Sequence, residues 1–184
     1  MYRLHPQEGP VDTVPFGAYR RSLFEQVGGY DESLLSNEDY EFNTRVRKSG
    51  GVVWLDPAIC STYIARSSLP ALARQYWRYG FWKLKMLQQH PESLRWRQAL
   101  PPIFAASLVA LALASLLLPA ARLVLLAELL CYLLVLAGAG LQAALRGHAP
   151  LLVLGLPLAI SVMHLSWGGG FLWSLASGRY AVHG

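Results

Sequence analysis

The sequence predicts a polar segment of mixed α and β structure, followed by an all-α membrane region of three helices. The first observation is the charge distribution, because 23 of the 27 charged residues lie in residues 1–98. The second is a set of three apolar stretches near the length of about 20 residues that crosses a bilayer. These features exclude a simple soluble globular domain, and the high hydrophobicity excludes intrinsic disorder.

The polar segment contains two predicted helices. We expect one over residues 20–27, ended by Gly28 and Gly29, where a left-handed conformation favours glycine. A second begins after Asn37, a residue type that caps helix N-termini, and ends at Gly50. The turn around Asp31 separates them.

Two short strands are expected after the second helix, over Val52–Leu55 and Ile59–Ile64, with a turn at Asp56-Pro57 between them. Two strands are too few for a complete α/β domain, and about 65 residues cannot bury a sizeable core alone. The sequence therefore predicts a partial domain over residues 1–66.

Residues 67–99 are expected to form a linker that contains an amphipathic helix from about Leu69 to Gln88, capped by Ser67 or Ser68. Its broad apolar and aromatic side lies opposite the basic side chains of Arg74, Arg78 and Lys85. This pattern is typical of a helix in the membrane interface. A core-facing helix with a solvated basic side is the alternative.

The membrane region covers residues 100–184, with spans expected at about 100–118, 123–145 and 151–176. Pro157 and the triplet Gly168–Gly170 predict a kink or break in the third span. Basic residues concentrate just before the first span, so the positive-inside rule predicts a multi-pass protein of the cytoplasmic (inner) membrane whose polar segment is cytoplasmic.

Isolated polar residues in the spans allow two interpretations each. Glu128 is a functional candidate, or it reaches the interface beside Arg122. His164 is a packing or interfacial histidine, or a ligand that lacks a partner at metal-binding spacing. Cys60 and Cys131 lie in segments with different solvents, which disfavours a disulfide between them.

Two patterns in the polar half could carry chemistry. Glu38 and Asp39 stand at a predicted helix N-terminus, where the helix dipole favours ionised carboxylates; such residues are more often caps than catalysts. Gln75 and Arg78, three residues apart on one helix face, could together grip an anion or a sugar. Basic residues with aromatics also occur in nucleic-acid binders, but no recognition motif for nucleic acid is present, and we expect no such partner.

Several motifs in order resemble membrane-bound family 2 glycosyltransferases of the succinoglycan-biosynthesis type. The motifs are a glycine loop with paired arginines (Phe16-Gly17-Ala18-Tyr19-Arg20-Arg21), a GG-aromatic-DE turn (Gly28 to Glu32), the acidic pair Glu38-Asp39, a Gln-x-x-Arg-aromatic motif (Gln75 to Tyr79) and the tail His164 to Phe171. Tyr79 stands where the family has Trp. The resemblance implies the acceptor-side part of a GT-A-like nucleotide-diphospho-sugar transferase fold, joined to its membrane region.

The resemblance also implies inverting transfer of a sugar from a nucleotide-diphosphate donor to a polysaccharide or lipid-linked acceptor. Asp39 would be the general base, with Glu38 orienting it or the acceptor. The substrate-binding residues implied are Gly17, Arg20, Arg21, Asp31, Gln75, Arg78 and Tyr79. A polyprenyl phosphate acceptor is a further possibility, and the lipid bilayer is an expected partner.

A divalent metal, Mg²⁺ or Mn²⁺, is expected for the complete enzyme, but its Asp-x-Asp ligand motif does not occur in this sequence. We therefore predict a chain that begins inside the transferase domain, lacks the nucleotide-binding half and has doubtful activity alone. The alternative function is a noncatalytic three-span scaffold or a subunit of an export complex.

Overall fold

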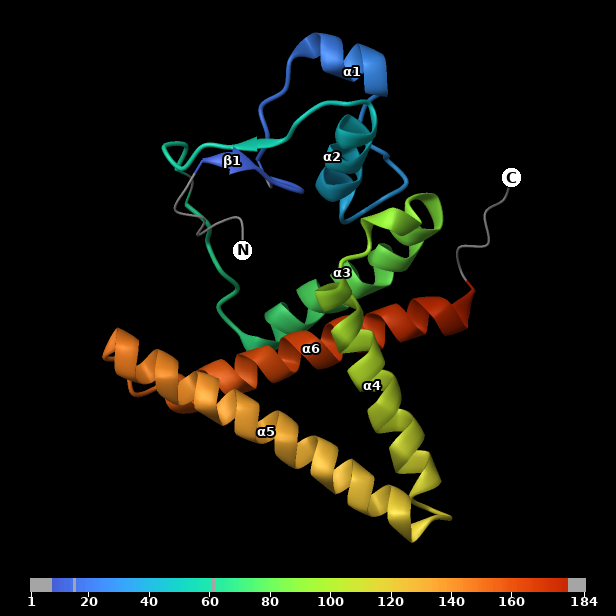
Figure 1. Cartoon of the computed structure of the whole chain (residues 1–184), viewed down its shortest axis with the longest axis vertical. Coiled ribbons are helices and arrows are strands. Elements are labelled where there is room, and N and C mark those ends of the chain that lie inside the picture. Colours follow the sequence, from blue (N-terminus) through green and yellow to red (C-terminus); the bar gives the residue numbers. More distant parts are fainter. Residues whose placement is uncertain (1–7, 15, 61, 179–184) are drawn as a thin grey trace. The chain divides into compact units, whose positions relative to one another are not determined.

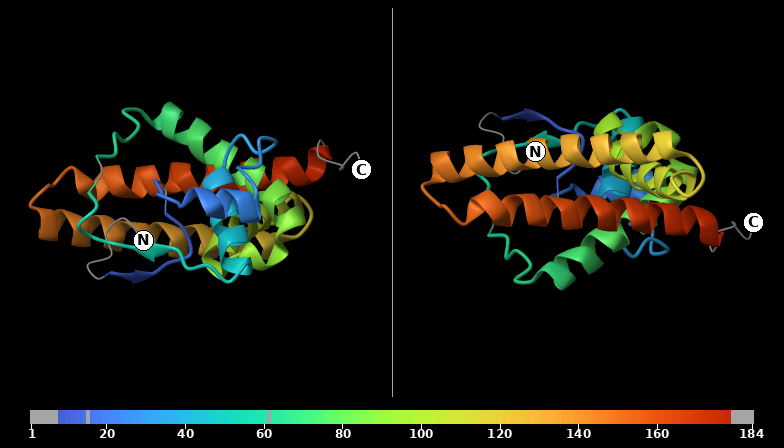
Figure 2. Two further views of the ribbon diagram at one scale, coloured as in Figure 1. Left: turned by 90° about the horizontal axis from the view of Figure 1, so that it is seen from above. Right: turned by 90° about the horizontal axis from the view of Figure 1, so that it is seen from below.

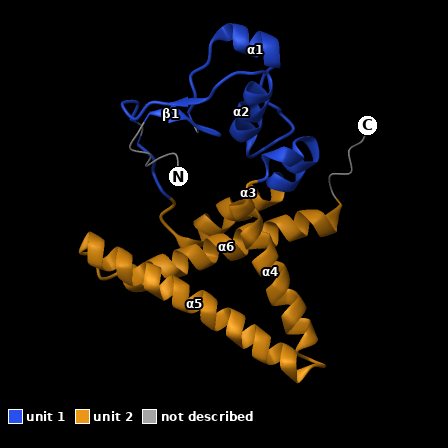
Figure 3. Cartoon of the chain, in the orientation of Figure 1, with its two compact units in different colours: residues 1–65, 82–94 blue, residues 66–81, 95–184 orange. Residues whose placement is uncertain are grey.

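A computed structural model describes residues 8–14, 16–60 and 62–178 of the chain. These residues form two compact units, shown in Figure 3. Unit 1 comprises residues 1–65 and 82–94, and unit 2 comprises residues 66–81 and 95–184. The boundary falls inside one continuous helix, α3 (Leu69–Gln89), which contributes residues to both.

Unit 1 contains two short helices and a minimal sheet (Figure 1). The helices are α1 (Arg21–Val27) and α2 (Glu38–Lys48). The strands are β1 (Gly9–Pro10) and β2 (Trp54–Leu55), paired antiparallel with Gly9 opposite Leu55. After α3, a short 3₁₀ helix, η2 (Pro91–Ser93), ends this unit's second segment. The core is small and centres on Phe42, Val46 and Val53.

The ends of α1 and α2 confirm the predicted glycine stops. Gly28 follows α1 with a φ of 81°, and Gly50 follows α2 with a φ of 86°. The amides of Gly50 and Gly51 bond the carbonyls of Arg47 and Val46, a Schellman pair that satisfies two orphan carbonyls of α2.

Two local predictions for unit 1 are wrong in part. The described residues of 59–64 form no strand; β-branched and aromatic residues favour a strand only where a neighbouring strand offers hydrogen bonds. Asn37 does precede α2, but it adopts a left-handed conformation with φ 69° and makes no side-chain capping hydrogen bond to the helix.

The described residues include three helices long and apolar enough to cross a membrane, all in unit 2. They are α4 (Trp96–Ala114), α5 (Pro119–Gly147) and α6 (Leu152–Ser177). The first begins about four residues earlier than predicted, which places Pro101 and Pro102 inside it. Helices α5 and α6 lie side by side (Figure 2), with Gly140 against the Val153 carbonyl.

Of the kink or break predicted in the third span, the break is wrong, because α6 is one helix of 26 residues that contains both Pro157 and the glycine triplet. The glycines instead allow close backbone approach. A methyl group added at Gly168 would lie 2.4 Å from the Pro101 carbonyl oxygen of α4, and one at Gly170 would lie 2.3 Å from the Trp77 carbonyl oxygen of α3. The triplet is thus where α6 meets two other helices.

Candidate functional site

Glu38 and Asp39 form the first turn of α2, together with Glu41. The free N–H groups and the dipole of a helix N-terminus stabilise a negative charge there by about 0.3–1 kcal/mol. Asp39 is half-buried, and its Oδ1 accepts the backbone N–H of Tyr40 at 2.7 Å. Glu38 is exposed. The structure therefore places an ionisable carboxylate on a rigid element, as the sequence predicted.

Asn43 fixes the glycine loop beside α2. It is fully buried, accepts the Tyr19 hydroxyl at 2.6 Å, and donates to Thr13 Oγ1 at 2.8 Å and to the Val14 carbonyl at 3.3 Å. Asp39 lies one turn earlier on α2, and side chains four residues apart share a helix face. The loop carrying Gly17 is thus held against the face that carries Asp39.

The pKa of the Tyr19 phenol also depends on the charge of Asp39. Burial raises the pKa of the Tyr19 phenol, and nearby Tyr30 raises it further, whereas the Asn43 hydrogen bond lowers it. The charge of Asp39 is a further cause that raises this pKa. The Asp39 carboxylate therefore lies within electrostatic range of the Tyr19 hydroxyl.

An open depression of about 1020 Å³ adjoins this loop within unit 1. Among the residues that line it are Gly17 and Arg20 of the predicted set, with the rings of Phe16, Tyr19 and Trp54. Aromatic faces mixed with polar groups are typical of surfaces that bind amphipathic ligands. Arg21 does not line the depression; its side chain is 95% exposed and pairs with Glu25 on α1 at 3.4 Å.

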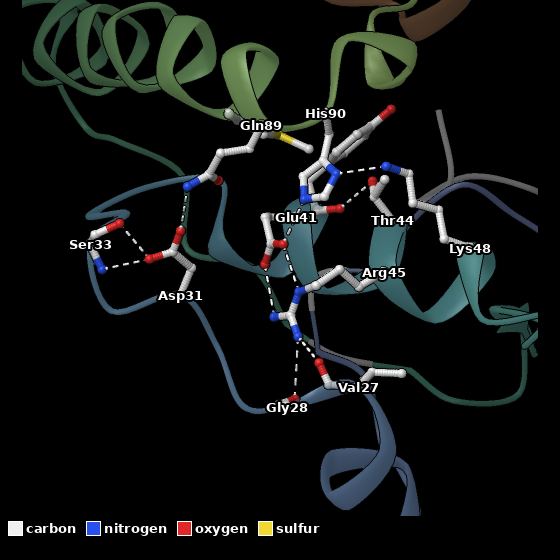
Figure 4. Close-up of polar contacts among 12 residues, drawn as sticks. Val27, Gly28, Asp31, Ser33, Glu41, Thr44, Arg45, Lys48, Gln89 and His90 are labelled. Atoms are coloured by element: carbon white, nitrogen blue, oxygen red, sulfur yellow. Dashed lines mark hydrogen bonds and ion pairs between the residues drawn. The ribbon is translucent and has the colours of Figure 1, made fainter. Parts of the chain in front are cut away.

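Asp31 anchors a turn in the same unit. Its Oδ1 accepts the backbone N–H of Ser33 at 2.9 Å and also the Ser33 hydroxyl, while Oδ2 accepts the Gln89 amide of α3 at 3.1 Å (Figure 4). Burial alone would raise the pKa of Asp31, but these hydrogen bonds, with the charge of Lys85, hold it below the usual value. Both carboxylate oxygens are therefore already engaged in holding the turn.

Sequence reasoning missed a polar cluster in which the half-buried Arg45 and His90 surround the buried Glu41, and which we call the Glu41 cluster. Arg45 binds both carboxylate oxygens of Glu41, with Nε to Oε1 at 2.6 Å and Nη2 to Oε2 at 2.9 Å, and His90 Nε2 lies 3.0 Å from Oε1 (Figure 4). The spacing of Glu41 and Arg45, four residues apart on a helix, was the available signal. No local pattern indicated His90, which is 49 residues away.

The Gln-x-x-Arg-aromatic motif lies on the part of α3 that belongs to unit 2, whereas Asp39 belongs to unit 1. The Gln75 side chain donates to the Tyr79 hydroxyl at 2.5 Å and accepts from Arg66 Nε at 3.0 Å. Arg78 is exposed on the same helix. Gln75 thus joins Tyr79, as its spacing allows, and Arg66, which the sequence did not single out.

The two isolated polar residues of the spans face other helices. Glu128 Oε1 and the Ser107 hydroxyl of α4 are hydrogen-bonded, whereas Arg122 Nε donates to the Ser115 carbonyl at 2.8 Å. Glu128 thus has a hydrogen-bonding partner on the neighbouring helix, and its position at the membrane interface beside Arg122 stays a prediction. His164 Nδ1 lies 3.2 Å from the Tyr132 hydroxyl, as expected for a packing histidine.

Comparison with known proteins decides the family. The sequence pattern described as Glycosyl transferase family 21 matches residues 17–181, almost the whole chain. The chain belongs to this family. Its expected resemblance to family 2-type glycosyltransferases is confirmed, and the match contains every predicted site residue from Gly17 to Tyr79.

Two curated proteins are similar in sequence to this chain. The chain is 32% identical over 167 residues to the Succinoglycan biosynthesis protein ExoA of Rhizobium meliloti (strain 1021), covering 89% of this chain and 48% of that protein. It is 28% identical over 86 residues, 46% of this chain and 27% of the relative, to a Methanococcus voltae protein. That protein is named Dolichyl N-acetyl-alpha-D-glucosaminyl phosphate 3-beta-D-2,3-diacetamido-2,3-dideoxy-beta-D-glucuronosyltransferase.

The chain spans about half the length, or less, of the curated relatives it matches. No solved structure matches it. The metal expected for glycosyltransferases of this type does not fit the residues present here. The sequence has no Asp-x-Asp motif, and the described residues bring together no three His, Cys, Asp or Glu side chains able to hold a metal ion.

Proposed function

We propose that this chain is the acceptor-side and membrane part of an inverting glycosyltransferase. It would transfer a sugar from a nucleotide-diphosphate donor to a polysaccharide or lipid-linked acceptor at the cytoplasmic face of the inner membrane. The observation that carries the proposal is the family match over residues 17–181, which includes an acidic pair held at the start of α2. Unit 1 would be part of a GT-A-like fold, and the nucleotide-binding half would come from a segment outside this sequence.

Asp39 is the proposed general base. In the transfer step, the acceptor oxygen forms a bond to the anomeric carbon as the bond to the diphosphate breaks, and Asp39 takes the acceptor proton. A positioned base contributes about 10² to 10⁴ in rate. A helix N-terminus favours the ionised form of a carboxylate, and only that form can accept a proton. Glu38, exposed beside it, would orient the acceptor.

Saccharide binding is proposed for the depression of unit 1. Gly17 leaves room at its edge, Arg20 supplies donors for hydroxyl or phosphate oxygens, and Trp54 offers an aromatic face for a sugar ring. Asp31 would contribute through the turn that it anchors, and Arg21 through its exposed guanidinium. A polyprenyl phosphate is one of the acceptors that these charged residues could bind.

The departing diphosphate develops negative charge, and Gln75 and Arg78 are proposed to stabilise it. Arg66 supports this role because its guanidinium holds the Gln75 carbonyl oxygen. Tyr79 supplies an aromatic surface and fixes the Gln75 amide from the other side. A Mg²⁺ or Mn²⁺ ion is proposed for the complete enzyme only, and none of these steps is assigned to it.

The experiment is transfer by membranes that contain the chain, expressed together with its upstream coding region and supplied with radiolabelled nucleotide sugars and Mg²⁺ or Mn²⁺. We expect a labelled lipid or polysaccharide product, and Asp39→Asn should reduce turnover by about 10²-fold or more with donor binding retained. Glu25→Gln is the matched control, because Glu25 is an exposed carboxylate on α1. Near-normal turnover of Asp39→Asn would refute the base assignment. Absence of transfer with every donor would favour the alternative of a noncatalytic membrane scaffold or export subunit.

A further inference from the structure

Glu41 has an environment unlike that of its acidic neighbours on α2. It is only 2% exposed, and its carboxylate is fully occupied by Arg45 and His90. A carboxylate so enclosed cannot touch a substrate. Whatever Glu41 contributes must therefore act through its partners.

Arg45 extends the cluster to the backbone of another segment. Its Nη1 donates to the carbonyl of Val27 and lies 3.4 Å from that of Gly28 (Figure 4). Its Nη2 donates to the carbonyl of Gly29 at 2.6 Å. These carbonyls lie at the end of α1, where the helix leaves acceptors unsatisfied. One guanidinium thus holds the start of the turn that continues into Tyr30 and Asp31.

His90 ties the end of α3 to the same carboxylate. Lys48 Nζ lies 3.0 Å from His90 Nδ1 and can only donate there, so Nε2 carries the proton and donates to Glu41. The neighbouring Gln89 holds Asp31, and Lys85 donates to the Ser33 carbonyl at 3.0 Å. The turn is therefore held from α2 on one side and from α3 on the other.

A buried ion pair is a weak source of net stability, since well-packed apolar residues of similar volume often serve as well or better. The planar guanidinium of an arginine does, however, fix the direction and distance of the groups that it binds. We propose that Glu41 is a positioning residue of the transfer site. It orients Arg45 and His90, which hold the turn of Gly28 to Leu34 in one position beside the first turn of α2 that carries Asp39. The expected effect on transfer rests on the proposed function, whereas the expected effect on the turn does not.

The test compares Arg45→Lys and Glu41→Gln in the full chain, reconstituted in lipid nanodiscs, with Glu25→Gln as the control. Glu25 also pairs with an arginine four residues away on a helix, but both side chains of that pair are exposed. Lysine preserves a charge opposite Glu41 but cannot bind the three carbonyls. Hydrogen exchange at the amides of residues 28–34 should accelerate about tenfold or more in both cluster variants and remain unchanged in the control.

Turnover of the upstream-extended enzyme supplies the second measurement. Arg45→Lys should lower kcat by about 10- to 100-fold while the donor KM changes by less than about twofold, because misplacement affects the reacting geometry more than donor binding. Unchanged exchange at residues 28–34 would overturn the proposal whether or not transfer is detected. Faster exchange with normal kcat, in an enzyme that Asp39→Asn inactivates, would also overturn it by showing a purely structural role. Should Glu41→Gln fail to fold, Arg45→Lys and His90→Gln carry the same comparison.

Discussion

At the scale of single residues, the polar unit depends on side chains that join distant segments. Asn43 is the clearest case, because its amide binds the Tyr19 hydroxyl, the Thr13 hydroxyl and the Val14 carbonyl from a fully buried position. A buried amide that loses a partner keeps the cost of its desolvation. Asn43 therefore helps to hold the loop that carries Gly17 and Arg20 against α2.

Replacement of Tyr19 by Phe tests this attachment. The variant keeps the ring contact with Phe42, at 4.9 Å between centroids, but leaves Asn43 Oδ1 without its hydroxyl donor. We expect a loss of about 1–3 kcal/mol in the free energy of unfolding of unit 1, measured by denaturant titration with near-UV circular dichroism. Tyr30→Phe is the control, because Tyr30 is 45% exposed and its ring also lies 4.9 Å from the ring of Phe42. Equal stabilities of the two variants would contradict the role of this bond.

Asp31 makes the stability of unit 1 depend on pH. Its pKa is lower in the folded chain than the ordinary value of 3.8. A carboxyl with a depressed folded pKa contributes stability above its unfolded pKa, and that contribution is lost as the pH falls through the folded pKa. Asp31→Asn should therefore destabilise the chain at about pH 7 and lose this effect progressively below about pH 4. Unfolding midpoints of both proteins across this range provide the measurement; a constant difference would refute the prediction.

At the scale of elements, glycine determines how the helices of unit 2 meet. Gly80 of α3 packs against the Trp167 carbonyl of α6, and Gly168 and Gly170 of α6 pack against α4 and α3. The sequence predicted the helices because hydropathy and length are local properties. The sequence also predicted a disruption at the glycine triplet, because a glycine in an isolated helix costs stability. In unit 2, however, the missing side chain of glycine permits backbone contact between helices.

Gly80→Ala is the sharpest test of this packing. The added methyl group would lie 2.1 Å from the Trp167 carbonyl oxygen, so α3 and α6 must separate. We expect a lower thermal midpoint in detergent micelles and faster hydrogen exchange over residues 165–172. Gly155→Ala is the matched control, because it lies within α6 with nothing within 4 Å of the new methyl group. Alanine there should be neutral or stabilising by about 1 kcal/mol. A Gly80→Ala variant as stable as the control would contradict the proposed contact.

At the scale of the whole molecule, the uneven charge distribution predicts orientation. Most basic residues precede α4, and the described residues include three helices that could cross a membrane. From the positive-inside rule we predict that unit 1 lies in the cytoplasm. An odd number of crossings would put the two ends of the chain on opposite sides.

The two native cysteines allow a test of this orientation without an introduced cysteine. Cys60 is exposed in unit 1, and Cys131 lies within α5. A membrane-impermeant maleimide should label Cys60 only after the inner membrane is permeabilised, and Cys131 should remain unlabelled in both conditions. Cys60→Ser is the control that identifies the signal. Labelling of Cys60 in intact spheroplasts would place unit 1 outside and refute the prediction.

Local patterns alone determined the partition into a polar and an apolar half, the glycine-terminated helices of unit 1, the acidic first turn of α2 and the resemblance to glycosyltransferases. Each depends on neighbours in sequence, whose spacing, charge and hydropathy can be read directly. The tertiary structure alone decided that Glu41 rather than Glu38 is enclosed, that His90 reaches it, that Asp31 anchors a turn and that the glycine triplet packs helices. These outcomes arise from contacts between residues far apart in the chain, because burial and hydrogen bonding depend on which segments meet.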